Sequence, residues 1–393
     1  MSRQERGTPR RILPVVIAAQ FAGTSLWFAG NAIAGDLQRA FELPVGAGFA
    51  LTSAVQVGFI VGTLAYAAAM LADRWSPSRL FLASAVAAAA SNLAVGWVAT
   101  DLVGLAAFRF GTGFFLAGVY PVGMKLAADW FEGGLGTALG WLVGALVLGT
   151  AFPHLLAAFV HDLPWQAVLV GTSALAVCGG VAVAAWVPDG PYRVPSRAFR
   201  PLATWRAFRA PAFRSAALGY FGHMGELYAF WAFVPALIAL RFGTEAPSTS
   251  LVAFGVIAVG AVGCVVGGYA SLRVGSARVA TASLVASGLA CLASPFLVGL
   301  PTWAFVAVLM AWGVVVVSDS PQFSALVARA APAEVRGSAL TIVTSVGFAV
   351  TVPAIQGLAW LLPRVPIEAL FLPLAIGPAL GLAAMRATPR EGA

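Results

Sequence analysis

The chain has 393 residues, of which 60% are apolar and 10% are charged, and its formal net charge is +8. Soluble domains carry about 25% charged and about 45–50% apolar residues, so this composition excludes a soluble enzyme, a disordered chain and a secreted disulfide scaffold. The three cysteines, Cys178, Cys264 and Cys291, show no paired spacing. We therefore expect neither a disulfide framework nor a bound metal ion, and no cofactor.

Twelve apolar runs follow one another along the chain, and each approaches the length of about 20 residues at which a helix crosses the bilayer core. Charged residues or Pro/Gly turns bound these runs, which are 12–33, 49–70, 80–99, 102–124, 134–158, 165–187, 213–240, 250–271, 278–299, 302–328, 337–361 and 365–386. The one long separator, 188–212, contains five prolines and five arginines. We interpret it as a cytoplasmic linker between a six-helix bundle at 1–187 and a second at 213–393.

The basic residues predict the orientation of the chain, because cytoplasmic loops of membrane proteins are enriched in Lys and Arg. With a cytoplasmic N-terminus, 19 of the 23 basic residues fall on the cytoplasmic face, three on the other face, and Arg109 within a span. This distribution predicts an integral protein of the bacterial inner membrane with both termini in the cytoplasm. Contacts with lipid headgroups account for the net charge, without a nucleic-acid partner. The stretch 201–213 is either a short helix on the inner membrane surface or a solvated loop.

The two halves resemble each other at an offset of about 200 residues. Gly113 and Pro121 in the fourth span match Gly313 and Pro321 in the tenth. Ser25-Leu26-Trp27 in the first span likewise matches Glu226-Leu227-Tyr228 in the seventh. Agreement on one offset indicates a duplicated six-span unit with parallel halves, an arrangement in which the halves rock about a site near the bilayer midplane.

Local motifs point to a known family. After the second span the chain reads Leu71-Ala72-Asp73-Arg74, Arg109 opens an R-x-x-x-G pattern in the fourth span, and Glu334-Val335-Arg336-Gly337 follows the tenth. With these motifs the chain resembles the major facilitator superfamily over its whole length. The resemblance implies an all-α membrane protein with twelve transmembrane helices in two pseudo-symmetric six-helix bundles. It also implies a secondary transporter in which spans 1, 4, 7 and 10 surround the central cavity; we expect a monomer.

The resemblance also suggests a conformational latch at the cytoplasmic ends of the helices. A carboxylate such as Asp73 can accept hydrogen bonds from the exposed N–H groups at a neighbouring helix start, and the family places the helix beginning near Gly337 beside it. We therefore expect Asp73, Arg74 and Arg336 to latch the two halves while the cytoplasmic side is closed. The alternative is a polar turn that only orients the chain.

Three charged residues lie deep in spans, where an ionisable group costs about 2.5–3.5 kcal/mol even on the gentlest scale. They are Arg109, Glu226 and Asp319, and His223 stands one helical turn before Glu226. Because burial favours the uncharged form of an acid, we expect Glu226 and Asp319 to carry protons, with His223 as a hydrogen-bonding partner. Arg109 anchors an anionic substrate group or one of the acids. The alternative is a fixed ion-pair network between Arg109 and an acid.

Polar and aromatic side chains at similar depths on spans 1, 4, 7 and 10 are the expected substrate contacts, although plain helix packing explains them almost as well. Together with Arg109 they are Trp27, Asn31, Tyr120, Tyr228, Ser318 and Gln322.

These features predict a secondary active transporter of a small solute that works by alternating access and is driven by protons. Within transport, the alternatives are a uniporter or exchanger of a small organic anion and a multidrug exporter. A passive channel is the alternative of another class. An enzyme is not expected, because the three histidines, His154, His161 and His223, fall on separate segments and form no metal-binding cluster.

Overall fold

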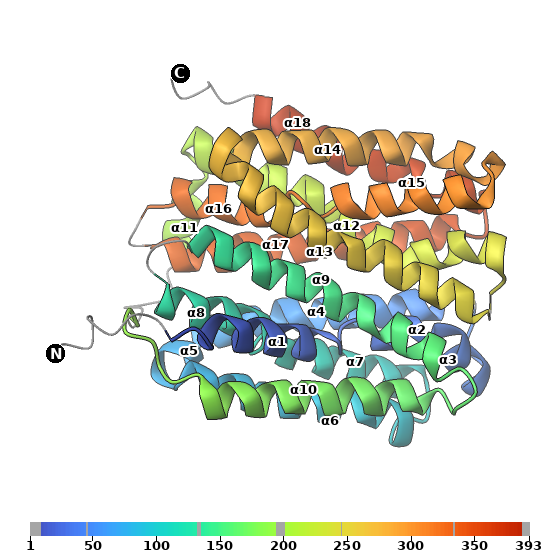
Figure 1. Ribbon diagram of the computed structural model, residues 1–393, viewed down its shortest axis with the longest axis horizontal. Helices are drawn as coiled ribbons and strands as arrows, with labels where there is room; N and C mark the ends of the chain where they lie inside the picture. Colours follow the sequence, from blue (N-terminus) through green and yellow to red (C-terminus); the bar gives the residue numbers. More distant parts are fainter. Residues whose placement is uncertain are drawn as a thin grey trace. The chain divides into compact units, whose positions relative to one another are not determined.

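The protein, seen in a computed structural model, is described over residues 9–44, 46–131, 135–193, 201–244, 246–332 and 335–386. Within these ranges all regular structure is helical, as the sequence predicted (Figure 1). Glu334 of the motif after the tenth span lies outside them. Five of the basic residues used to predict the orientation also lie outside, namely Arg3, Arg6, Arg197, Arg200 and Arg390.

The first compact unit comprises Met1–Ala198. Within it α4 packs against α7, α6 against α10, and α1 against α9 and α10. The side chain of Asp101 starts α7 by accepting a hydrogen bond of 2.7 Å from the backbone N–H of Gly104, as expected of an N-cap residue. The helices are α1 (Ile12–Thr24), α2 (Ala29–Ala32), α3 (Ala34–Ala40), α4 (Ala47–Ala68), α5 (Leu71–Arg74), α6 (Pro77–Trp97), α7 (Leu102–Leu116), α8 (Tyr120–Trp130), α9 (Leu135–Phe159) and α10 (Gln166–Trp186).

The second compact unit comprises Phe199–Ala393. Its longest helix, α12, packs against α16, α17 and α18. Prolines open α11, α12 and α13, where their missing N–H would have no helical partner. The α-helices are α11 (Pro201–Ala207), α12 (Pro211–Phe242), α13 (Pro247–Val274), α14 (Ser276–Ala293), α15 (Thr302–Val315), α16 (Ser320–Ala330), α17 (Arg336–Leu361) and α18 (Ile376–Arg386). Three 3₁₀ turns accompany them, η2 (Ser294–Gly299), η4 (Ile367–Ala369) and η5 (Leu372–Ala375).

Eleven helical segments of the described chain are long and apolar enough to cross a membrane, and α1 is a shorter apolar helix. Four of the predicted spans are interrupted, the twelfth by the 3₁₀ turns before α18 and three others at short breaks. The first breaks at Ser25–Phe28, between α1 and α2; the fourth breaks between α7 and α8, just before Pro121; the tenth breaks between α15 and α16, just before Pro321. A proline removes a backbone donor and disfavours helix in the residue before it, which explains the second and third breaks but not the first.

The duplication expected from the sequence is visible in the helix contacts. A Cβ atom on Gly113 would lie 2.0 Å from the carbonyl oxygen of Val55, and one on Gly313 would lie 1.9 Å from the carbonyl oxygen of Val256. In each unit a glycine therefore allows two helices to cross backbone against backbone, as small residues do in membrane bundles. The matching residues are 200 and 201 positions apart, so the two bundles share one packing scheme.

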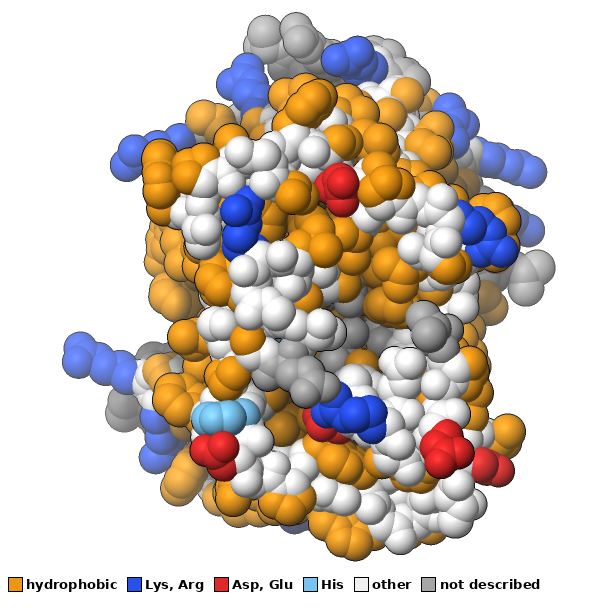
Figure 2. Space-filling view, turned by 90° about the vertical axis from the view of Figure 1, so that its right-hand side faces the viewer, with side chains coloured by type: hydrophobic (Ala, Val, Ile, Leu, Met, Phe, Trp, Pro, Cys, Tyr) orange, Lys and Arg blue, Asp and Glu red, His pale blue; other side chains and the backbone are white. Residues whose placement is uncertain are grey.

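Large apolar side chains cover much of the surface. Figure 2 shows them over the flanks of the molecule, with charged side chains scattered on the face turned to the viewer. Val103, Phe159, Phe296 and Trp303 expose at least 75% of their surface. An exposed apolar surface of this extent indicates contact with lipid rather than with water.

The beginning of the linker is attached to the first unit. The Ser76 hydroxyl donates to Oδ1 of Asp189 at 2.8 Å, and Nη2 of Arg193 donates to the carbonyl oxygen of Trp75 at 2.7 Å. At the far end of the linker, α11 is a short helix that packs against α17. One of the two interpretations of the sequence expected a short helix here.

Candidate functional site

Four ionisable side chains predicted as functional are each only 1% exposed: Arg109, His223, Glu226 and Asp319. Arg109 lies on α7 in the first unit. His223 and Glu226 lie on α12 in the second unit, and Asp319 lies in the break between α15 and α16. Charge this deeply buried needs a compensating partner, so the contacts of each residue indicate what it can do.

Arg109 holds the broken first span. Its Nη2 donates to the carbonyl oxygen of Trp27 at 2.5 Å, and both Nη atoms lie 3.3 Å from the carbonyl oxygen of Leu26. These carbonyls belong to the break at Ser25–Phe28, where the regular helical bonding of α1 has ended. The guanidinium, with its fixed fan of donors, therefore satisfies backbone groups that would otherwise be orphaned in the bilayer interior.

A buried amide completes this arrangement. Nη1 of Arg109 donates to Oδ1 of Asn92 at 2.9 Å. The Asn92 amide in turn donates to Oγ of Ser173 at 3.1 Å and to Oγ1 of Thr172 at 3.3 Å. All these acceptors are neutral, and in the described part of the chain no carboxylate pairs with Arg109. The expected alternative of an ion pair between Arg109 and an acid is therefore not what the described residues form.

In the second unit, His223 pairs with Asp319. Nδ1 of His223 lies 2.9 Å from Oδ1 of Asp319, and neither side chain is accessible to solvent beyond 2%. The rings of Tyr220 and Phe323 flank the imidazole, with centroids 6.0 and 6.1 Å away. Nε2 of His223 has no hydrogen-bond partner among the described residues. This contact joins α12 to the break before α16.

Glu226 has a different environment, although it lies one turn from His223. Its Oε1 accepts a hydrogen bond of 3.0 Å from Nε1 of Trp312 and one of 3.3 Å from Sγ of Cys291. The sequence placed His223 beside Glu226, whereas the acid in contact with His223 is Asp319. Two side chains three residues apart lie on the same broad face of a helix. The neighbouring helices determine which groups each of them contacts.

The predicted substrate contacts divide between the units. In the first unit the ring of Phe59 lies between those of Trp27 and Tyr120, at centroid distances of 4.8 and 6.5 Å. Nε1 of Trp27 donates to Oε1 of Gln56 at 3.2 Å. Asn31 is half-buried on α2.

In the second unit, Tyr228 packs against Trp231 and Phe348, at centroid distances of 5.2 and 5.1 Å. Ser318 and the buried Gln322 flank Asp319 at the break, and the Ser318 hydroxyl donates to the carbonyl oxygen of Val314 at 2.5 Å. Most of these side chains are thus engaged in packing.

One of the predicted latch residues, Asp73, has a partner within its own unit. Nζ of Lys125 lies 3.2 Å from Oδ1 of Asp73 and 3.6 Å from Oδ1 of Asp129. Arg74 is exposed at the end of α5, and Arg336 begins α17. The acid of the L-A-D-R motif is therefore neutralised by a lysine in the middle of α8.

Sequence reasoning missed the residues that support the candidates. Asn92 was detectable, since an amide inside an otherwise apolar span is costly to bury. Trp312 and Cys291 carried no such signal, because an indole or a thiol in a span is ordinary. Lys125 was counted for orientation but was not connected to Asp73.

A comparison with protein families finds that the model of the Major Facilitator Superfamily matches residues 14–355. This range contains every candidate residue described above. A search of curated proteins finds no match.

Proposed function

This chain belongs to the major facilitator superfamily, whose members are membrane transporters of small molecules, and we propose that it is a proton-coupled secondary transporter working by alternating access. In this proposal the titratable side chains of the second unit carry the protons, and the chain lies in a bacterial inner membrane with both termini in the cytoplasm. The basic residues concentrated on one face support that orientation.

One observation carries the proposal: the second unit buries two acids without pairing either to a lysine or an arginine among its described residues. Glu226 accepts hydrogen bonds from an indole N–H and a thiol, and the ionic contact of Asp319 among the described residues is with the imidazole of His223. A carboxylate removed from water without a permanent cation is costly and tends to neutralise by taking a proton. Such groups suit reversible protonation better than a fixed ion pair does.

The His223–Asp319 pair supplies a route from protonation to conformation. A proton on Asp319 neutralises its carboxylate and weakens the charge attraction to His223, which lies on α12. The proton's movement down the membrane potential releases about 2.3 kcal/mol per 100 mV, which is enough to bias an equilibrium between two conformations by about 50-fold.

Arg109 acts in this proposal as a scaffold residue. Both of its Nη atoms are occupied by carbonyls and by Asn92, which supports a structural role over an anchor for an anionic substrate. The remaining predicted substrate contacts are proposed within each unit separately: Trp27, Asn31 and Tyr120 in the first, and Tyr228, Ser318 and Gln322 in the second.

Asp73 and Arg336 belong to a cytoplasmic latch, with Arg74 at the end of the same motif. The exchange of Lys125 between Asp73 and Asp129, 3.2 and 3.6 Å from its Nζ, offers a way to free Asp73 for that role.

A pH titration of the purified protein in lipid tests the proton sites, because Trp312 is a built-in reporter 3.0 Å from Glu226. We expect Trp fluorescence of the wild type to show a transition between pH 5 and pH 9. Trp312 should report one part of this transition. Both Glu226→Gln and Trp312→Phe should remove that part. Asp319→Asn should remove a separate part that Trp312→Phe leaves in place.

Unchanged curves in both acid variants would reject proton carriage by these residues and favour a uniporter or an exchanger of a small organic anion. A multidrug exporter would instead show the transition together with binding of hydrophobic cations. Measurable conductance in planar bilayers would favour a passive channel.

A further inference from the structure

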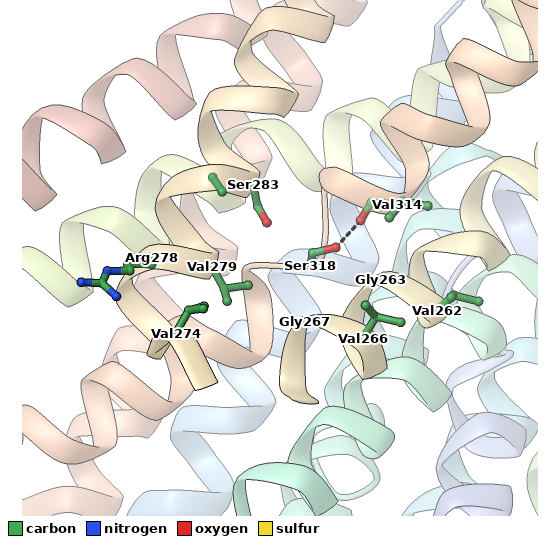
Figure 3. A pocket seen from close by; sticks show the side chains of 11 residues that line it. Val262, Gly263, Val266, Gly267, Val274, Arg278, Val279, Ser283, Val314 and Ser318 are labelled. Atoms are coloured by element: carbon green, nitrogen blue, oxygen red, sulfur yellow. Dashed lines mark hydrogen bonds between the residues drawn. The ribbon is translucent and has the colours of Figure 1, made fainter. Parts of the chain in front are cut away.

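A groove on the second unit runs between α13 and α14 and has the break between α15 and α16 at its floor. Its volume is about 600 Å³. Figure 3 shows its valines along α13 and α14, Ser318 at the break, and Arg278 at one end. It is separate from the buried acids, although Ser318 is the residue next to Asp319.

Two glycines of α13 let this helix pack closely against the break at the floor of the groove. A Cβ atom on Gly263 would lie 2.4 Å from Oγ of Ser318, and one on Gly267 would lie 3.1 Å from the carbonyl oxygen of Ser318. On the outer side of the same helix, Val262 and Val266 expose 58% and 59% of their surface. The walls are therefore apolar and open to the surroundings of the molecule.

The charge at the end of the groove has no counter-ion nearby. Arg278 is exposed and forms no ion pair with any residue that the structure describes. Between Pro247 and Ser318 the sequence contains no Asp or Glu at all, so none of the helices α13, α14 and α15 can supply one. An anion that meets Arg278 beside the groove therefore does not come from these three helices.

The dimensions match one leaflet of a bilayer. From Val262 to Val274 the helix α13 rises about 18 Å, and half of the hydrocarbon core measures about 15 Å. By the distribution of Lys and Arg, the end with Arg278 is the cytoplasmic one, where the membrane surface is rich in anionic lipids.

We propose that this groove binds an anionic phospholipid of the cytoplasmic leaflet, with an acyl chain along Val262, Val266 and Val279 and the phosphate at Arg278. This proposal does not depend on proton coupling. Its occupant lies against Ser318, so a bound lipid restrains the break that carries Asp319.

Lipid binding to the purified full chain tests the headgroup contact. Native mass spectrometry during a titration with phosphatidylglycerol gives the dissociation constant of the first bound lipid. Arg278→Gln should weaken it about fivefold, the factor that corresponds to about 1 kcal/mol per juxtamembrane arginine. Arg273→Gln is the matched control, because Arg273 is equally exposed at the end of α13 but does not line the groove, and it should leave the constant unchanged.

The acyl chain contact has its own test. Ala282 lines the groove and is exposed, whereas Ala277 is exposed on the same helix outside it. Ala282→Phe should block the first lipid and Ala277→Phe should not. The proposal is overturned if the two arginine variants weaken binding alike, if Ala282→Phe binds as the wild type does, or if phosphatidylcholine binds as tightly as phosphatidylglycerol.

Discussion

The two units share one scaffold but bury different kinds of polar groups. In the first unit a permanently charged guanidinium, Arg109, holds a span that is broken at Ser25–Phe28. In the second, α12 is continuous from Pro211 to Phe242 and carries His223 and Glu226 instead. A duplicated bundle can thus keep its helix crossings while one copy buries a guanidinium bound to backbone carbonyls and the other buries acids that meet no lysine or arginine among the described residues.

The variant with the largest expected effect on stability lacks the guanidinium of Arg109. Arg109→Gln leaves the carbonyls of Leu26 and Trp27 without their donors, and an unsatisfied buried group costs about 1–3 kcal/mol. We expect a loss of several kcal/mol in stability, read as a lower melting temperature in detergent, and Arg109→Lys should rescue it poorly because a lysine lacks the planar fork of donors. Glu226→Gln in the second unit should melt close to the wild type. An Arg109→Gln protein with unchanged melting but lost substrate binding would instead make Arg109 a substrate anchor.

A second test asks whether the shared scaffold is equally tight in both units. Gly113→Ala and Gly313→Ala each place a Cβ atom about 2 Å from a carbonyl oxygen, and forced overpacking costs about 1–3 kcal/mol. We expect both variants to lower the melting temperature by similar amounts. Gly357→Ala is the control, since its Cβ would meet nothing within 4 Å. A large effect in one unit alone would show that the repeat is no longer equivalent in packing.

The smallest effect is expected when a tryptophan beside a neutral amide is compared with one beside a carboxyl group. Trp27 donates to the neutral amide of Gln56, and Trp312 donates to the carboxyl group of Glu226. Hydrogen bonds to charged groups contribute about 1.5–3 kcal/mol and neutral ones about 1. Trp312→Phe should therefore destabilise more at pH 8 than at pH 5, because the lost bond is stronger where the acid is ionised.

Trp27→Phe removes the same volume and should destabilise equally at both pH values. Thermal melting of both variants at the two pH values measures the difference. Equal pH profiles for the two variants would argue that Glu226 does not change its protonation in this range.

The sequence predicted the elements whose causes are local. Apolar runs of membrane length predicted the helices, and Pro121 and Pro321 lie at the interruptions of the fourth and tenth spans. The break at Ser25–Phe28 could not be predicted, because these four residues include no proline and their carbonyls depend on Arg109, more than 80 positions away.

The burial of the candidate acids was predicted, but their partners were not. Glu226 and Asp319 were expected deep in their spans, and each is 1% exposed. The rotation of one helix about its axis relative to another decides which acid meets His223 and which meets Trp312. That rotation depends on packing between helices distant in the chain, which a single sequence does not reveal.

The attachment of Arg193 to the loop of the L-A-D-R motif has a mechanical consequence. Its bond to the carbonyl of Trp75 anchors the chain to the first unit, and α11 begins in the second unit at Pro201. Seven residues lie between these two anchors, so the eight steps from Arg193 to Pro201 span at most about 28 Å when fully extended. Removing the bond, for example by Arg193→Ala, would lengthen the unattached connection and so increase the range of motion that it allows the two units.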